Sequence, residues 1–195
     1  MVLQYLDNIY FLLLSYGILG AGLKYIDDAF DEKSFSKRKG LLLAPLLGCL
    51  WAVTMLVNLY SATLLLAIVL GVLLKGKIDN LAHLLGLASI LVIIIIVRVE
   101  LLVLPLIFLT AAGVIDEVGN DIVGANPSNP SGDKFRYRFA SYFFGRRYFL
   151  KVALLYLVLI GCFPLEFLLA LIFFDEAYLT IDLYSKSKKL KSWTS

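Results

Sequence analysis

The sequence predicts an all-α polytopic membrane protein, and three observations lead to that fold class. Hydrophobic residues make up 61% of the 195 residues, with a mean hydropathy of +0.87, whereas a typical soluble domain is about 45–50% apolar. Apolar runs such as 84–97 are continuous, unlike the alternating strands of membrane barrels. Basic residues gather beside alternate ends of these runs, as they do in the cytoplasmic loops of helical membrane proteins.

The apolar runs predict about seven transmembrane helices in a single integral-membrane domain that covers 1–195. We expect them at about 6–26, 41–59, 61–75, 81–97, 99–115, 147–163 and 164–184. The third to fifth are short for a bilayer, which suggests tilt, local thinning or a partly re-entrant path. With the N-terminus outside, 17 of the 18 Lys and Arg residues lie on the cytoplasmic side, and Arg98 is the exception. The positive-inside rule therefore predicts an N-out, C-in protein of the cell membrane.

Two polar segments complete this topology. A cytoplasmic loop at about 116–146 contains the turn-rich stretch 119–133, followed by interleaved basic and aromatic residues over 134–148. That composition is typical of a segment at the membrane interface, so we expect membrane lipid rather than nucleic acid as its partner. The basic tail at about 185–195 is expected to be a juxtamembrane anchor on the same side.

Acidic residues recur after a bulky apolar residue in four places. The phrases are Asp27-Asp28-Ala29-Phe30-Asp31, Asp116-Glu117 with Asp121, Asp175-Glu176, and a weaker form at Asp79-Asn80. Clustered carboxylates in so apolar a chain need partners or a cation. Three of the phrases fall at cytoplasmic ends of odd-numbered helices, which is compatible with repeated helical hairpins, although the spacings are uneven. We expect the phrases to converge on one polar site facing the cytoplasm.

The spacing within the first two phrases suits a hard cation. Asp27, Asp28 and Asp31 lie at i, i+1 and i+4, so that two or three carboxylates can share one face of a helix. Glu117 and Asp121 also stand at i and i+4. Oxygen ligands of this kind suit Mg²⁺, which proteins usually hold with one or two carboxylates and substrate phosphates. An ordinary cluster of ion pairs at the membrane interface is the alternative explanation.

Asp79 and His83 share a helical face at the spacing i and i+4, and His83 is the sole histidine. A carboxylate with an imidazole can bind a transition metal or act as a catalytic base and its orienting group. Alternatively, His83 is a packing residue, and Asp79 or Asn80 caps the next helix.

Asp175 and Glu176 are predicted to lie near the centre of the bilayer, in the last expected span. A charge at this depth costs at least about 2.5–3.5 kcal/mol, so a partner or a polar cavity should face it. Asp182 lies seven residues after Asp175 and continues the same helical face toward the cytoplasm.

The segment Asp27-Asp28-Ala29-Phe30-Asp31, followed by Lys33, Lys37, Arg38 and Lys39, resembles the first aspartate-rich motif of UbiA-type membrane prenyltransferases. In that family two such motifs hold Mg²⁺, which binds a prenyl diphosphate. The resemblance implies that Asp116, Glu117 and Asp121 form the second motif. It also implies that Arg146, Arg147 or Lys151 neutralises the diphosphate, with Lys37 and Arg38 near it. This chain is shorter than usual for the family and lacks its leading Asn-Asp.

A second resemblance points to related chemistry. Ile26-Asp27-Asp28-Ala29-Phe30-Asp31 is similar to the Asp-Asp segment of polyprenyl-phosphate sugar-phosphate transferases of the MraY/WecA type. Ile78-Asp79-Asn80-Leu81-Ala82 is similar to their Asp-Gly-Leu-Ala. Both resemblances imply carboxylates, Mg²⁺ and a phosphorylated isoprenoid lipid at the cytoplasmic interface.

Three functional hypotheses follow. The first is a Mg²⁺-dependent transferase acting on an isoprenoid (di)phosphate, in which Asp28, Asp116, Asp79 and His83 are the candidate catalytic residues. The second is a cation transporter whose intramembrane path is lined by Asp175, Glu176 and Asp182. The third is a non-catalytic membrane subunit or scaffold whose acidic clusters bind a partner or form structural ion pairs.

Overall fold

The computed structural model describes residues 8–76, 80–125 and 134–194, and this part of the chain is all-α, with no strands. The prediction of an all-helical chain is confirmed. Eight helices are described: α2 (Ile9–Phe30), α3 (Lys37–Val57), α4 (Leu59–Leu74), α5 (Leu81–Ile96), α6 (Val103–Ala125), α7 (Lys134–Gly145), α8 (Tyr148–Leu159) and α9 (Leu165–Thr194).

Three helices begin at asparagine caps. The side chain of Asn8 accepts a hydrogen bond from the Tyr10 amide, and that of Asn58 accepts one from the Ser61 amide. Asn58 has extended backbone angles, so it ends α3 and starts α4. Asn80 accepts a bond of 2.9 Å from the amide of His83, which confirms its expected capping role. These caps satisfy amides that the first turn of a helix leaves unpaired.

Two helix boundaries differ from the sequence prediction for local steric reasons. The helix expected at 99–115 is α6, which begins at Val103. Pro105 is then in the first turn, where proline is tolerated, whereas a start at 99 would place it in the interior. The helix expected at 147–163 is α8, which ends at Leu159. Gly161 follows with a φ of +74°, a left-handed conformation that ends the helix.

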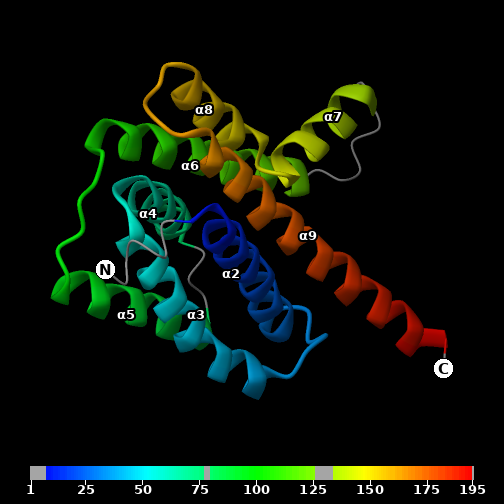
Figure 1. Ribbon diagram of the computed structural model, residues 1–195. Helices are drawn as coiled ribbons and strands as arrows, with labels where there is room; N and C mark the ends of the chain where they lie inside the picture. The colour runs from blue at the N-terminus through cyan, green and yellow to red at the C-terminus, as the bar shows by residue number, and fades with distance from the viewer. Residues whose placement is uncertain (1–7, 77–79, 126–133, 195) are drawn as a thin grey trace.

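The last helix is longer than expected. α9 does not stop near residue 184 but continues through the basic tail to Thr194. Lysine is a good helix former, and the pair Asp182–Lys186, at i and i+4, supports the extension at 2.6 Å between carboxylate and ammonium. In Figure 1, α9 runs from the centre of the bundle to a C-terminus that projects beyond it. The segment 119–133 likewise starts as helix, because α6 continues to Ala125.

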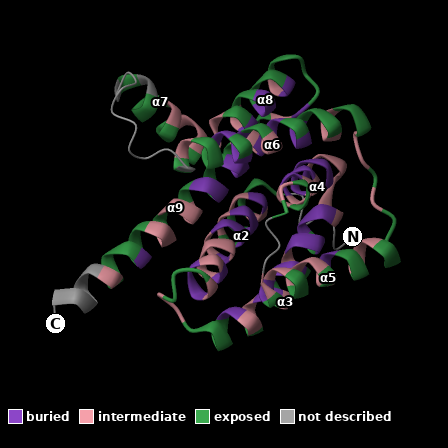
Figure 2. Ribbon diagram, turned by 180° about the vertical axis from the view of Figure 1, so that it is seen from behind, coloured by how far each residue is buried: buried purple, intermediate pink, exposed green. Residues whose placement is uncertain are grey.

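The helices form a bundle around α2 (Figure 1). α2 packs along α9 on one side and α3 on the other, α3 packs on α5, and α4 packs on α6. α8 covers α6, and α7 lies beside the end of α6. The buried faces of these helices turn inward, as Figure 2 shows, and meet in one apolar core that includes Tyr16, Leu65, Leu154 and Phe174.

Glycines allow the closest helix contacts. A Cβ added to Gly20 on α2 would lie 2.0 Å from the carbonyl oxygen of Phe174 on α9. A Cβ on Gly48 of α3 would lie 2.4 Å from the carbonyl oxygen of Gly86 on α5. Such close approach of backbones is typical of helix packing in membranes.

By length and composition, three helices in the described part can cross a membrane: Ile9–Phe30, Lys37–Val57 and Val103–Gly124. Three shorter apolar helices are Leu59–Leu74, Leu81–Ile96 and Tyr148–Leu159. Large apolar side chains cover the outer surface of α5 and α6, among them Ile95, Ile96 and Leu104, which are 81%, 76% and 80% exposed.

Replacing Gly20 by alanine should weaken the contact between α2 and α9. Because the added Cβ would overlap the Phe174 carbonyl, we expect the free energy of unfolding in detergent to fall by about 1–3 kcal/mol. Gly17→Ala, on the same helix with open space around the new Cβ, is the matched control and should be neutral or slightly stabilising. Equal effects of the two substitutions would contradict this packing.

Candidate functional site

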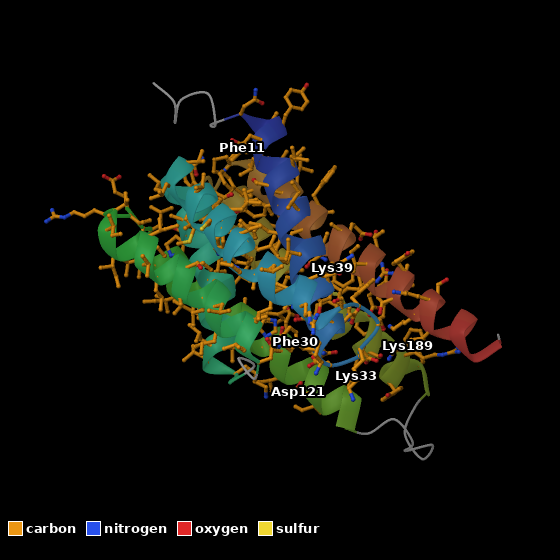
Figure 3. The ribbon with its side chains drawn as sticks, turned by 90° about the horizontal axis from the view of Figure 1, so that it is seen from below. Phe11, Phe30, Lys33, Lys39, Asp121 and Lys189 are labelled. Carbon is orange, nitrogen blue, oxygen red and sulfur yellow. The ribbon has the colours of Figure 1, made fainter. Side chains whose placement is uncertain are left out.

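A cavity of about 600 Å³ lies at the end of the bundle where α2 and α6 finish. Figure 3 shows Lys33, Asp121 and Lys189 near this end and Phe11 at the opposite one. One wall is apolar and is formed by α2, α3, α4 and α5, with Leu47, Trp51, Ile68 and Ile90 among its residues. The other wall is polar and is formed by the ends of α2 and α6, the turn before α8, and α9.

Carboxylates from three of the predicted acidic phrases line this one cavity. α2 and the residues after it contribute Asp27, Asp28, Asp31 and Glu32; α6 contributes Asp116 and Glu117; α9 contributes Asp175 and Asp182. Among the described residues that line the cavity, the basic side chains are those of Lys24, Arg146 and Arg147. Negative charge therefore exceeds positive charge around the polar end.

Lys24 joins the acidic residues of α2 and α9. Its Nζ lies 3.1 Å from Oδ1 of Asp28, one turn later on the same helix, and 2.9 Å from Oδ1 of Asp182 on α9. The ammonium also lies 5.2 Å from the centre of the Tyr178 ring, within range of a cation–π contact. Asp28 is only 1% exposed, and its Oδ2 is buried without a hydrogen-bond partner in the described part of the chain.

Asp27 connects α2 to two other helices. Its Oδ2 accepts a 2.9 Å hydrogen bond from the Tyr178 hydroxyl on α9, and its Oδ1 lies 2.8 Å from Nε2 of His83 on α5. The Asn80 amide nitrogen lies 2.9 Å from Nδ1 of His83. Because Asn80 uses its oxygen as the helix cap, this nitrogen donates, and Nδ1 accepts. The remaining ring proton therefore sits on Nε2, the nitrogen that lies beside Oδ1 of Asp27.

Asp116 acts as the N-terminal cap of α8. Its two oxygens accept hydrogen bonds of 3.1 Å and 2.7 Å from the amides of Phe149 and Leu150. The local cap residue, Arg147, makes no side-chain cap bond and has a left-handed backbone with φ of 51°. Arg147 instead places its guanidinium 3.4 Å from Glu117 and 5.3 Å from the Tyr178 ring centre.

Asp175 is 5% exposed, and Lys151 on α8 supplies the partner that its depth in the fold demands. The ammonium lies 2.7 Å from Oδ2 of Asp175 and also donates to the carbonyl of Arg146 at 2.8 Å. The predicted partner for a deep carboxylate therefore exists and is a lysine. Asp182 lies two turns after Asp175 on the same face of α9, as the spacing predicts, and also lines the cavity. Glu176, which is next to Asp175 in the sequence, is exposed.

The remaining predicted site residues lie elsewhere. Asp121 pairs with Lys75 at the end of α4, at 2.9 Å. Lys37 and Arg38 are exposed at the start of α3, outside the cavity lining. Asp79 falls outside the described residues. Among those described, no three His, Cys, Asp or Glu side chains are grouped closely enough to hold a metal ion, so neither expected metal triplet forms a cluster.

α9 also covers the connection between α2 and α3. Lys189 pairs with Glu32, and Lys188 donates a 2.9 Å bond to the carbonyl of Ser34. Phe35 stacks between Tyr25 and Tyr184, with centroid distances of 4.4 Å and 6.2 Å. The basic tail, expected to be a lipid anchor, thus contacts the loop that follows the first acidic phrase.

Lys24 and Tyr178 were not singled out by the sequence patterns. Both have a spacing signal in retrospect: Lys24 precedes Asp28 by four residues, and Tyr178 follows Asp175 by three. Each therefore shares a helical face with a carboxylate already identified. Comparisons of the chain with protein-family models, with curated proteins and with solved structures found no match.

Asp116→Asn should destabilise α8, because one of the two backbone amides loses its acceptor. We expect a loss of about 1–2 kcal/mol in the free energy of unfolding and faster hydrogen exchange at Phe149 and Leu150. Asp121→Asn is the control on the same helix, where an exposed ion pair should contribute less than about 1 kcal/mol. Unchanged exchange at both amides would argue against the cap.

The contact between Glu32 and Lys189 should be sensitive to pH. The hydrogen bond and charge of Lys189 lower the pKa of Glu32. The pair therefore stabilises the contact above the ordinary glutamate pKa of about 4.3, and this contribution is lost as pH falls through the lowered pKa. With spin labels at Lys33 and Ser187, the distance distribution should broaden in acid and at high salt. In the Glu32→Gln variant the distance distribution should be broad at every pH. A narrow distribution in this variant would contradict a stabilising role for the Glu32–Lys189 pair.

Proposed function

We propose that this protein is an integral membrane transferase that acts, with Mg²⁺, on an isoprenoid diphosphate or phosphate lipid at the cytoplasmic interface. The observation that supports this function best is the cavity itself. Its apolar wall adjoins a wall of carboxylates and arginines, a combination that suits a ligand with a hydrocarbon chain and a phosphorylated head.

The surface of the bundle supports a membrane location for all of its apolar helices. The exposed apolar side chains of α5 and α6 form more apolar surface than a soluble monomer normally presents to water. We therefore place the three shorter apolar helices and the first part of α9 in lipid beside the three long helices, for about seven spans in the N-out, C-in orientation. A helix of 16 residues is about 24 Å long, so α5 requires local thinning of a bilayer core of about 30 Å.

The apolar wall provides room for an isoprenoid chain. Small residues from α3 and α5, including Ala44, Gly48, Ala82 and Gly86, line it between larger ones such as Trp51. A chain held there would extend from the polar end toward the core of the bundle. In this binding mode the phosphorylated carbon would lie beside the acidic residues.

The polar wall provides phosphate ligands and a reason for a metal. Arg146 and Arg147 are able to donate several hydrogen bonds to phosphate oxygens. The excess of carboxylates would repel a bare diphosphate, and a divalent cation between them removes that repulsion. Asp28 and Asp182 are suitable ligands, because Mg²⁺ commonly takes one or two carboxylates and completes its shell with phosphate and water. This donor set fits a metal that arrives with its substrate.

Transfer of a prenyl group would proceed by cleavage of the bond between the prenyl carbon and the diphosphate oxygen. The electron pair leaves with the diphosphate, and the acceptor nucleophile bonds to the carbon and releases its proton. Bound Mg²⁺ would supply charge stabilisation to the leaving group. Arg147 would hold the diphosphate through hydrogen bonds that strengthen as its charge grows.

The test is covalent capture of a photoreactive prenyl diphosphate by purified protein in lipid, together with release of diphosphate when acceptor extracts are added. The photoreactive lipid should label the wild-type protein when Mg²⁺ is present and should not label it when a chelator removes the metal. Arg147→Gln should reduce labelling about tenfold or more through loss of charged hydrogen bonds, while Arg38→Gln, outside the cavity, should leave it unchanged.

Asp28→Asn should abolish diphosphate release while the protein remains folded. Normal release by this variant would refute the proposed function. Ion flux in liposomes that depends on Asp175, without lipid labelling, would identify a transporter instead. The absence of labelling and flux, with single carboxylate-to-amide changes tolerated, would favour a scaffold.

A further inference from the structure

Lys24 holds its ammonium at a position suited to a metal ion. The Nζ lies between carboxylates of two different helices, 3.1 Å from Asp28 and 2.9 Å from Asp182. Lys24 is the ammonium that contacts both carboxylates, whereas Lys186, whose side chain is 68% exposed, pairs with Asp182 alone. In addition, Asp28 lines the cavity and is 1% exposed, and its Oδ2 has no hydrogen-bond partner among the residues that the structure describes.

We propose that Asp28 and Asp182 form a divalent-cation site that the Lys24 ammonium occupies in the ligand-free protein. The cation enters when a phosphate at the polar wall draws Lys24 away from the carboxylates. The entry of the cation on phosphate binding rests on the proposed function, because the phosphate is that of the lipid substrate. The existence of the cation site does not, because it concerns only the two carboxylates and the metal.

Charge and geometry favour this exchange. A buried carboxylate oxygen without a partner is costly, and a divalent cation would engage it while balancing both carboxylates. Mg²⁺ commonly binds only one or two protein carboxylates and completes its coordination shell with water or phosphate oxygens. Asp28 and Asp182 therefore suffice, even though the described residues contain no group of three His, Cys, Asp or Glu side chains that could hold a metal ion. Lys24 is able to move, since its charge is carried on a flexible stem.

The competing explanation is that Lys24 is a structural link between α2 and α9. That role predicts that its removal weakens the bundle and creates no metal site. The cation-site proposal predicts that removal of the ammonium leaves a vacant pair of carboxylates with affinity for a divalent ion.

The test is binding of Mn²⁺ alone to purified protein in detergent, measured by calorimetry and by the paramagnetic resonance of the bound ion. Lys24→Gln should bind Mn²⁺ about tenfold or more tightly than wild type, because it removes a competing positive charge beside the carboxylates. The double variant Lys24→Gln/Asp28→Asn should lose the gain. Lys186→Gln is the matched control: Lys186 also pairs with Asp182, at 2.6 Å, but is 68% exposed and does not line the cavity. It should bind like wild type.

Lys24→Met provides a second variant with a similar stem and no charge. If either variant folds and binds no more Mn²⁺ than wild type, the cation site is refuted. If both unfold, Lys24 is a structural link and the proposal fails as well. Failure here leaves lipid labelling and diphosphate release free to succeed, and their failure leaves metal binding by Lys24→Gln intact, so the two proposals are tested separately.

Discussion

Charged groups buried among apolar helices need partners, and this requirement shapes the polar end of the bundle. Lys24 lies between Asp28 and Asp182, and Lys151 reaches Asp175. An isolated charge at these depths would cost several kcal/mol. Because the partners belong to different helices, α2 is held against α9 and α8 against α9 at the level of the cavity. The same pairs that permit burial of the carboxylates thus set the geometry of the site.

Close packing brings these partners within reach. Gly20 lets the backbone of α2 approach Phe174 of α9, one residue before Asp175. One turn after Gly20, Lys24 meets Asp182, and one turn later Asp27 meets Tyr178. A larger residue at position 20 would separate the helices and lengthen these contacts. Apolar packing in the core and polar pairing at the cavity are therefore parts of a single α2–α9 interface.

Similar acidic phrases have different roles in the folded chain. Asp27 accepts a hydrogen bond from α9 and lies beside His83 of α5, Asp116 caps α8, and Asp175 pairs with Lys151. Asp28 differs from these because its Oδ2 is buried with neither a hydrogen bond nor an ion pair to any residue that the structure describes, whereas Oδ2 of Asp175 has the ammonium of Lys151 at 2.7 Å. This difference makes Asp28 the more suitable ligand for a cation, even though all four carboxylates lie within apolar helices.

The sequence by itself determined the helical class and most helix positions, because hydrophobic runs, asparagine caps and helix-ending residues act over a few neighbouring positions. It also determined the shared face of Asp175 and Asp182, which is a matter of helical spacing. Only the tertiary structure decided that Asp116 accepts from amides 33 and 34 residues away and that Lys24 bridges to Asp182 on α9. Such choices depend on which helices pack together, because a carboxylate takes whichever donor the neighbouring helix presents, and that neighbour is not encoded in local spacing.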